Sequence, residues 1–350
     1  MTNLKRPWSI LHLESIYLSP TNHCNLQCIM CPNSKMKIQR GYLDDNIFKK
    51  LITEIKELLL NELSSLKELH FSYDGEPFMH PKYIEMLKYI DKNIKGLKIF
   101  INTNASLLNE ELINDLLTLK NNHYYIIFSI DASYRELYEK IHVGGDFNKL
   151  QKNLKYTLER KRDCNIKNPY TVLQFIVMPE NAHDQHAFYW KWEYLLGPDH
   201  KASDYTWWNG LNESNCSHIY WKKLTSRWAD FEITYTYENG NNQGSKSKST
   251  CFHPDAPLRN GLVCAWPWKS ICISYKGGVG LCWAHWESSG LLGSLKFESL
   301  QQIFEGENAE KIRHLFWEKN YDDLPVCGNC DRRDWWFDSD LELKLEQINL

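Results

Sequence analysis

Apolar positions recur in two alternating periods over roughly the first two hundred residues of this chain. Short apolar runs such as residues 124–130 are typical of buried strands, and apolar residues three or four apart, as in residues 44–60, are typical of one helix face. The pattern predicts strands at residues 15–18, 69–73, 97–102, 124–130, 172–178 and 204–208. It predicts helices at residues 44–60, 83–90, 110–119, 134–141, 147–160 and 182–195.

This alternation of strands and helices predicts the fold class. Six strand–helix steps favour an α/β fold in which a parallel sheet curls into a partial (βα)6 barrel with its helices outside. In such folds the chemistry belongs to the loops that follow the C-terminal ends of the strands.

The alternation stops near residue 209, which suggests a division of the chain. Residues 209–261 are an aromatic-rich insert that contains a polar, flexible connector at residues 239–250. A hairpin (residues 271–275 and 279–283) and a helix (residues 298–318) then predict a small α+β domain. We therefore expect four parts: a barrel domain (1–208), the insert (209–261), a C-terminal domain (262–337) and a tail (338–350).

Composition and charge limit the classes of partner. The chain has 350 residues, and because 43% of them are apolar, it cannot be disordered over its whole length. Its formal net charge of −3 argues against a protein that wraps nucleic acid. Its apolar runs are too short for a membrane helix, so we expect neither nucleic acid nor membrane as a partner. Eleven Cys without a convincing signal peptide indicate metal or redox chemistry in a reducing cytoplasm.

Three cysteines follow the first predicted strand with C-x3-C-x2-C spacing: Cys24, Cys28 and Cys31. Three thiolates this close can hold a [4Fe–4S] cluster and leave one iron open to an outside ligand. The alternative is a Cys3His zinc site with His23, but adjacent residues in an extended loop rarely face the same point. The spacing favours the cluster.

This segment resembles the cluster motif of the radical S-adenosylmethionine (SAM) enzymes, and further short matches follow in order. Residues 74–77, Asp-Gly-Glu-Pro, resemble the family's Gly-Gly-Glu-Pro motif, with Asp in place of the first Gly. The resemblance implies that the cysteines hold the cluster, that SAM binds its open iron, and that Glu76 accepts the SAM amino group. The resemblance also implies that SAM is contacted by Met30, Gly75, Asn104, Ser129, Asp131 and Met178. Polar residues at strand ends, such as Asn104, Ser129 and Asp131, are also common helix caps.

A second group of cysteines lies near the C-terminus: Cys264, Cys282, Cys327 and Cys330. Taken alone, this group favours zinc. After a radical SAM core, however, a hairpin, a helix and a C-x2-C resemble the twitch domain, the short form of the SPASM domain, which carries an auxiliary [4Fe–4S] cluster. Four cysteines leave no open iron, so that cluster would move an electron or brace the domain. The arrangement is similar to that of 2-deoxy-scyllo-inosamine dehydrogenase.

The resemblance implies a radical SAM oxidoreductase. Reductive cleavage of SAM would yield a 5′-deoxyadenosyl radical that abstracts hydrogen from a substrate C–H, and a flavodoxin or ferredoxin would supply the electron. We expect a two-electron oxidation of a small polar, sugar- or cyclitol-like metabolite, although no catalytic base follows from spacing. One alternative is peptide maturation, although the short segment before the core leaves no space for a leader-binding domain. The others are epimerisation with a Cys as hydrogen donor and a non-catalytic zinc or electron-transfer protein.

The tryptophans of the barrel's last part and of the insert form a second compositional feature. Packing is their first interpretation, and a flat wall for a sugar or peptide substrate is the second. The residues concerned are Trp190, Trp192, Trp207, Trp208, Trp221 and Trp228.

Overall fold

The computed structural model describes residues 8–35, 38–196, 201–203, 216–223, 230–235, 245–250, 264–282, 291–320, 324 and 327. The chain divides into two compact units. The first unit comprises Met1–Thr21, Ile38–Tyr73 and Phe252–Leu350, and the second comprises Asn22–Lys37 and Asp74–Cys251.

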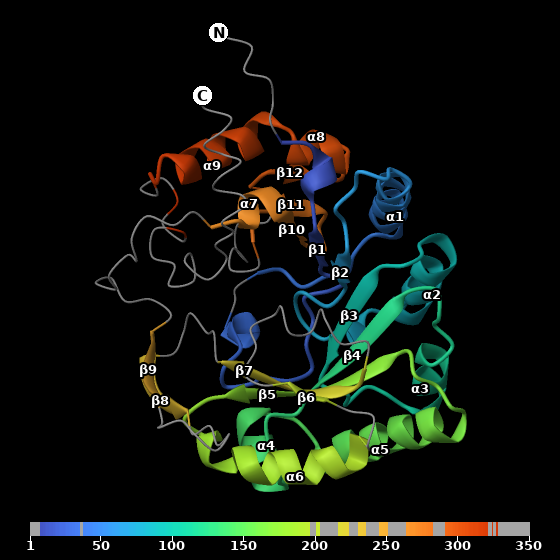
Figure 1. Cartoon of the computed structure of the whole chain (residues 1–350), viewed down its shortest axis with the longest axis vertical. Coiled ribbons are helices and arrows are strands. Elements are labelled where there is room, and N and C mark those ends of the chain that lie inside the picture. The colour runs from blue at the N-terminus through green and yellow to red at the C-terminus, as the bar shows by residue number, and fades with distance from the viewer. Residues whose placement is uncertain are drawn as a thin grey trace. The chain divides into compact units, whose positions relative to one another are not determined.

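The second unit is built on a parallel sheet with helices outside it (Figure 1). The strands lie in the order β3 (Lys98–Thr103), β4 (His123–Ser129), β5 (Tyr170–Val177), β7 (His218–Lys223) and β6 (Lys201–Ser203). The helices are α2 (Tyr83–Asn93), α3 (Glu110–Leu116), α4 (Arg135–Ile141), α5 (Phe147–Asp163) and α6 (Gln185–Leu196), with 3-10 turns η2 (Pro32–Lys35), η3 (Pro77–Met79) and η4 (Ala182–Asp184). The predicted α/β class with a parallel, open sheet is confirmed.

Nearly continuous apolar runs explain the strands of this sheet, because parallel strands are covered on both faces. The middle residues of β4 are buried, and Tyr125 and Ile127 join Phe100, Val172 and Tyr220 in one cluster that spans four strands. The sheet therefore has a rigid centre from which the loops at the strand ends project.

Two of the six tryptophans singled out in the sequence have a packing role here. Trp192 is buried against Phe188, and Trp221 lies against Phe175 with a centroid separation of 5.0 Å. Trp190 is 68% exposed on α6. Trp207, Trp208 and Trp228 lie outside the described residues.

The second unit also departs from the sequence prediction. The strand expected at residues 204–208 lies outside the described residues, whereas β7 pairs in parallel with β5 in a stretch where we expected no further strand. The polar run placed in a flexible connector includes β9 (Ser245–Thr250), which pairs antiparallel with β8 (Asp230–Tyr235). A polar composition does not prevent backbone pairing, so these residues form a strand although their sequence is rich in Ser and Lys.

The first unit combines segments from both ends of the chain. Its strands lie in the order β12 (Gly293–Ser294), β11 (Gly278–Gly280), β10 (Ser270–Ile273), β1 (Ser15–Leu18) and β2 (Glu68–His70). Strands β10, β1 and β2 are parallel, and β10 and β11 form the predicted hairpin. The helical elements are η1 (Ile10–His12), α1 (Asp45–Leu59), α7 (Trp266–Lys269), α8 (Leu300–Phe304) and α9 (Glu307–Trp317).

The helix expected at residues 298–318 is two helices. Gly306 separates α8 from α9 and has an extended backbone, with φ −76° and ψ 168°. A Cβ at this glycine would lie 2.6 Å from the Gln302 carbonyl oxygen. The backbone at the break therefore has no room for a side chain at this position. Apolar periodicity alone does not detect such a break.

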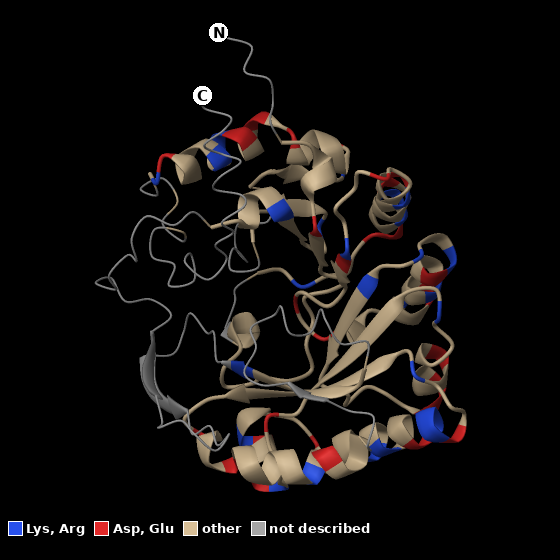
Figure 2. Ribbon diagram, viewed as in Figure 1, with Lys and Arg blue, Asp and Glu red and all other residues tan. Residues whose placement is uncertain are grey.

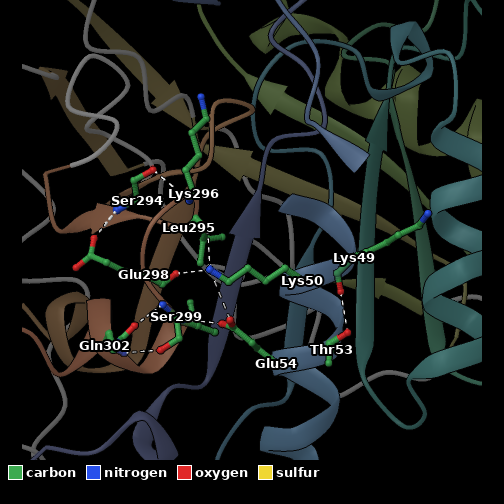
Figure 3. A network of polar contacts seen from close by, with 11 residues as sticks. Lys49, Lys50, Thr53, Glu54, Ser294, Leu295, Lys296, Glu298, Ser299 and Gln302 are labelled. Atoms are coloured by element: carbon green, nitrogen blue, oxygen red, sulfur yellow. Dashed lines mark hydrogen bonds and ion pairs between the residues drawn. The ribbon is translucent and has the colours of Figure 1, made fainter. Parts of the chain in front are cut away.

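Helix α1 is tied to the segment between β12 and α8 by hydrogen bonds from the half-buried Lys50 and its neighbour Glu54 (Figure 3). Lys50 Nζ donates to the carbonyl oxygens of Leu295 (2.8 Å) and Glu298 (2.6 Å). Glu54 Oε2 accepts from the Leu300 N–H at 2.6 Å, at the start of α8. One turn of α1 thus satisfies three backbone groups of the C-terminal segment.

Charged residues lie mainly on the helices, and the strands carry few of them (Figure 2). Among the described residues, no helix is both long enough and apolar enough to cross a bilayer.

Candidate functional site

The three cysteines of the first group lie on one loop of the second unit and are all partly exposed. The Cys31 N–H donates to the Cys28 carbonyl at 3.0 Å, which closes a tight turn between them. The N–H groups of Gln27 and Ile29 donate to the carbonyls of Val143 (2.9 Å) and Ile141 (3.0 Å). The loop is therefore held by backbone bonds to the end of α4.

The thiols are close enough to influence one another. The pKa of Cys28 is raised well above the ordinary thiol value, first by burial and then by the charges of Cys31, Cys24 and Asp131. A positive metal centre reverses such a shift, because a coordinating thiol loses its proton outright. The donor set thus fits the iron–sulfur cluster that the spacing favours.

The geometry differs from that of a site for one metal ion. Across the described ranges, no group of three His, Cys, Asp or Glu side chains is placed to hold a single ion. A cluster makes a different demand, because each cysteine binds its own iron atom.

Gly75 lies against the beginning of the cysteine loop. Its φ is +65°, and a Cβ there would lie 2.3 Å from the His23 carbonyl oxygen. The next N–H, of Glu76, donates to that same oxygen at 2.8 Å. Both the left-handed backbone and the close approach require glycine at this position.

Glu76 directly precedes η3, and its buried carboxylate lies beside the C-terminal end of β3. It accepts from Thr103 Oγ1 at 2.7 Å and from the Asn104 N–H at 2.8 Å. Burial raises the pKa of Glu76 to about 7, and these hydrogen bonds oppose the shift. A cationic group that reaches this carboxylate would stabilise its charged form.

A chain of amides and hydroxyls joins the cysteine loop to the same strand end. Asn104 Nδ2 donates to Asn25 Oδ1 at 3.0 Å, and Asn25 Nδ2 donates to Ser106 Oγ at 2.7 Å. Ser106 Oγ in turn donates to Asn104 Oδ1 at 2.5 Å. Asn25 lies inside the cysteine motif, yet its role was not evident from the sequence.

Asp131 follows β4 with a left-handed backbone (φ +57°) and a fully buried side chain. Its Oδ1 accepts from the Ile176 N–H at 2.5 Å, and its Oδ2 lies 3.0 Å from His142 Nε2. The other ring nitrogen, His142 Nδ1, lies 3.1 Å from Cys28 Sγ. His142 was missed by sequence reasoning, since none of the 13 His has diagnostic spacing.

The remaining predicted SAM contacts lie on the same unit. Ser129 ends β4 and is half-buried, and Met30 is half-buried between Cys28 and Cys31. Met178 is buried directly after β5, where its N–H donates to Asn181 Oδ1 at 2.8 Å. The structure therefore places every residue of this predicted set in one unit, while their contacts with SAM stay predictions.

The second cysteine group belongs to the first unit. Cys264 precedes α7, Cys282 follows β11, and Cys327 is buried. No described cysteine of either group forms a disulfide. Cys330 lies outside the described residues, so the four-cysteine ligand set stays a prediction.

Comparison with protein families decides the assignment. Residues 18–188 match the model of the radical SAM superfamily, and residues 264–331 match that of SPASM, an iron–sulfur cluster-binding domain. The chain therefore contains a radical SAM domain followed by a SPASM domain. The resemblance drawn from the cysteine spacing is thereby confirmed, and with it the expectation of two iron–sulfur cluster domains.

Curated relatives match this chain over part of their length. It is 25% identical over 171 residues to the tungsten-containing aldehyde ferredoxin oxidoreductase cofactor-modifying protein of Pyrococcus furiosus, which covers 48% of this chain and 45% of the relative. It is 28% identical over 149 residues to a GTP 3′,8-cyclase of Clostridium botulinum, covering 42% and 44% respectively. The chain thus spans less than half of either relative.

Solved structures share the fold over most of the chain. BtrN, in complex with AdoMet and 2-DOIA, has a TM-score of 0.51 at 14% identity, covering 91% of this chain and 93% of BtrN. SuiB of Streptococcus suis, bound to S-adenosylmethionine, has a TM-score of 0.56 at 12% identity, covering 91% and 71%. anSMEcpe with bound AdoMet has a TM-score of 0.57 at 15% identity, covering 96% and 92%.

Proposed function

We propose that this protein is an oxidoreductase that cleaves AdoMet on a cluster held by Cys24, Cys28 and Cys31. The observation that carries the proposal is the hydrogen-bond network that joins the cysteine loop to the end of β3. The network runs from Asn25 to Asn104, and the Asn104 N–H donates to Glu76. A cluster ligand loop and a buried acidic group thus share one polar site.

Within that site, each predicted residue has a task. We assign the AdoMet ammonium to Glu76, whose carboxylate is desolvated and therefore favours a cationic partner. Gly75 gives the ligand loop room, and Asn104, Ser129 and Asp131 supply polar groups for the carboxylate and ribose. Met30 and Met178 supply apolar surface beside the adenine. When bound, the cluster and AdoMet supply a 5′-deoxyadenosyl radical that abstracts a substrate hydrogen.

For the second cysteine group we propose an auxiliary [4Fe–4S] cluster with the ligands Cys264, Cys282, Cys327 and Cys330. Its four protein ligands would make it an electron acceptor rather than a substrate site. We therefore propose a two-electron oxidation, alcohol to ketone, of a small sugar- or cyclitol-like substrate. The shared fold with BtrN, whose structure holds AdoMet and the small molecule 2-DOIA, supports this choice. A flavodoxin or ferredoxin is the proposed electron donor.

Peptide modification is the second candidate. SuiB bound to its precursor peptide SuiA shares the fold with a TM-score of 0.56, and anSMEcpe with a Cp18Cys peptide does so with a TM-score of 0.54. The chemistry of AdoMet cleavage would be the same, and only the substrate would differ.

Anaerobic reconstitution tests the proposal. With dithionite and AdoMet, the protein should release methionine and 5′-deoxyadenosine, and the Glu76→Gln variant should release far less. Deuterium from a C-deuterated cyclitol or sugar should then appear in 5′-deoxyadenosine. Deuterium transfer from a labelled peptide instead would favour maturation, and no 5′-deoxyadenosine from protein with both clusters confirmed would reject the enzyme.

A further inference from the structure

Three side chains form a line from the ligand loop into the core of the second unit. Cys28 Sγ meets His142 Nδ1 at 3.1 Å, and His142 Nε2 meets Asp131 Oδ2 at 3.0 Å. His142 is 1% exposed and Asp131 is 0% exposed, so solvent does not compete for the contact between them. The line ends at backbone, because the Ile176 N–H donates to Asp131 Oδ1 at 2.5 Å.

The imidazole is held on every side. Asn181 Nδ2 donates to the Asp131 carbonyl at 2.9 Å and fixes the left-handed turn from which the carboxylate projects. The Tyr138 ring lies against the imidazole with centroids 4.7 Å apart. The backbone on both sides of His142 accepts the N–H groups of Gln27 and Ile29, which flank Cys28. The ring and the sulfur are therefore placed by the same few bonds.

The neighbours of the ring define its hydrogen-bonding role. A carboxylate is an acceptor, and so is a thiolate bound to iron. The imidazole thus lies between two acceptors, and the ring nitrogen that faces Cys28 is placed to donate an N–H to its sulfur. Hydrogen bonds to cluster sulfurs are among the features that set reduction potential, and outer groups of this kind orient metal ligands.

We propose that His142 is a positioning residue for the AdoMet-binding cluster: it fixes the Cys28 side chain and donates an N–H···S hydrogen bond that raises the potential of the cluster. The proposal rests on the proposed function, because it requires a cluster at Cys24, Cys28 and Cys31. An N–H donor stabilises the more negative, reduced cluster, so its loss should make reduction harder. Asp131 acts one step further out by holding the ring.

Two substitutions at one position separate hydrogen bonding from packing. His142→Leu removes the donor, and His142→Gln keeps an amide N–H of similar reach. His186→Leu is the matched control, because it removes an exposed histidine from α6 in the same unit. The measurements are iron per chain, the EPR signal that changes on AdoMet addition, and the midpoint potential of that signal in a redox titration.

We expect His142→Leu to lower the equilibrium constant for one-electron reduction about tenfold, which corresponds to about 59 mV. His142→Gln should fall between that variant and the unchanged protein, and His186→Leu should match the unchanged protein. Equal potentials in all four proteins, each with its AdoMet-responsive signal, would overturn the proposal. Reduced iron content with an unchanged potential in the loaded fraction would likewise reduce His142 to a packing residue.

A measurement on the unsubstituted protein covers the case in which neither variant loads a cluster. Protein labelled with ¹⁵N at histidine should show a nitrogen coupling to the reduced, AdoMet-responsive cluster in pulsed EPR. Absence of that coupling would overturn the inference. Failure of the proposed function looks different, since the unsubstituted protein would then show no AdoMet-responsive signal at all.

Discussion

Gly75 and Gly96 share a left-handed backbone but have different surroundings, which allows the steric demand at the site to be isolated. Gly75 has φ +65° and Gly96 has φ +83°. A Cβ at Gly75 would lie 2.3 Å from the His23 carbonyl oxygen, whereas one at Gly96 would meet nothing within 4 Å. Gly96→Ala should cost only the conformational strain, about 1 kcal/mol. Gly75→Ala should cost about 2–4 kcal/mol, because a backbone overlap is added.

Anaerobic urea denaturation of the two variants measures this difference, and iron content after reconstitution shows whether the ligand loop is disturbed. Equal losses of stability would mean that the cysteine loop yields readily to the added methyl group. The close packing of Gly75 on that loop would then contribute nothing to the free energy of unfolding.

The ionisation of Glu76 should govern the pH dependence of AdoMet binding. Burial raises its pKa from 4.5 to about 7, so in the AdoMet-free protein the carboxyl is protonated below that pH. An ammonium ligand requires the charged form, and affinity should therefore rise about tenfold between about pH 6 and about pH 8. The same raised pKa means that folding stability without AdoMet falls as the pH rises from about 4.5 towards 7.

Equilibrium binding of AdoMet to the reconstituted, oxidised protein across this range tests the expectation. Glu76→Gln should bind weakly, with a nearly flat pH profile. A profile with the same slope in Glu76→Gln would assign the titration to another group and remove the ammonium from Glu76.

Residues of the candidate site can be predicted from the sequence where the residues that act together lie close to one another along the chain. Cys24, Cys28 and Cys31 lie within one short loop, and Glu76 belongs to a compact motif. His142 is 114 residues from Cys28, and their contact arises only when the end of α4 docks on the ligand loop. No spacing rule connects two positions that tertiary packing brings together.

At the scale of elements, apolar periodicity located helices well and their ends less well. The helix predicted at residues 44–60 corresponds to α1. Its sequence was readable because six apolar residues are buried on one face and Asp44 caps the N-terminus. The breaks were harder to find. Gly306 divides one predicted helix, and the hydrophobic pattern gives no sign of that break. Strand β7 lies beyond residue 209, where the pattern predicts no further strand.

Lys50 and its neighbour Lys49 offer a matched test of what α1 contributes to the first unit. Lys50 Nζ donates to the carbonyls of Leu295 and Glu298, whereas Lys49 makes an exposed ion pair with Asp45 at 2.7 Å. Lys50→Met should cost about 1–3 kcal/mol, because it leaves two carbonyl groups without this donor. Lys49→Met should stay within about 0.5 kcal/mol.

Hydrogen–deuterium exchange locates the effect. In Lys50→Met, amides in residues 293–304 should exchange faster, while those of the second unit should not change. Equal exchange in the two lysine variants would mean that the segment is held by its own hairpin and by α8, without help from α1.

For the molecule as a whole, the chain ends form one unit that no local pattern foretold. Strand β1 pairs in parallel with β10, and residues 15 and 270 are direct partners. Strands so far apart in sequence pair only at a large cost in loop-closure entropy, which no local sequence pattern reveals. The consequence for function is that each compact unit carries its own cysteine group.

Because the two groups lie in different compact units, their clusters should load independently. The unsubstituted protein should hold about eight irons per chain, and about four should remain after Cys24, Cys28 and Cys31 are replaced by Ala. Replacement of Cys264 and Cys282 should also leave about four irons, but only this second variant should keep an EPR response to AdoMet. Zinc in place of iron, or loss of all iron from either variant, would contradict the assignment, since two self-contained ligand sets do not share their metal.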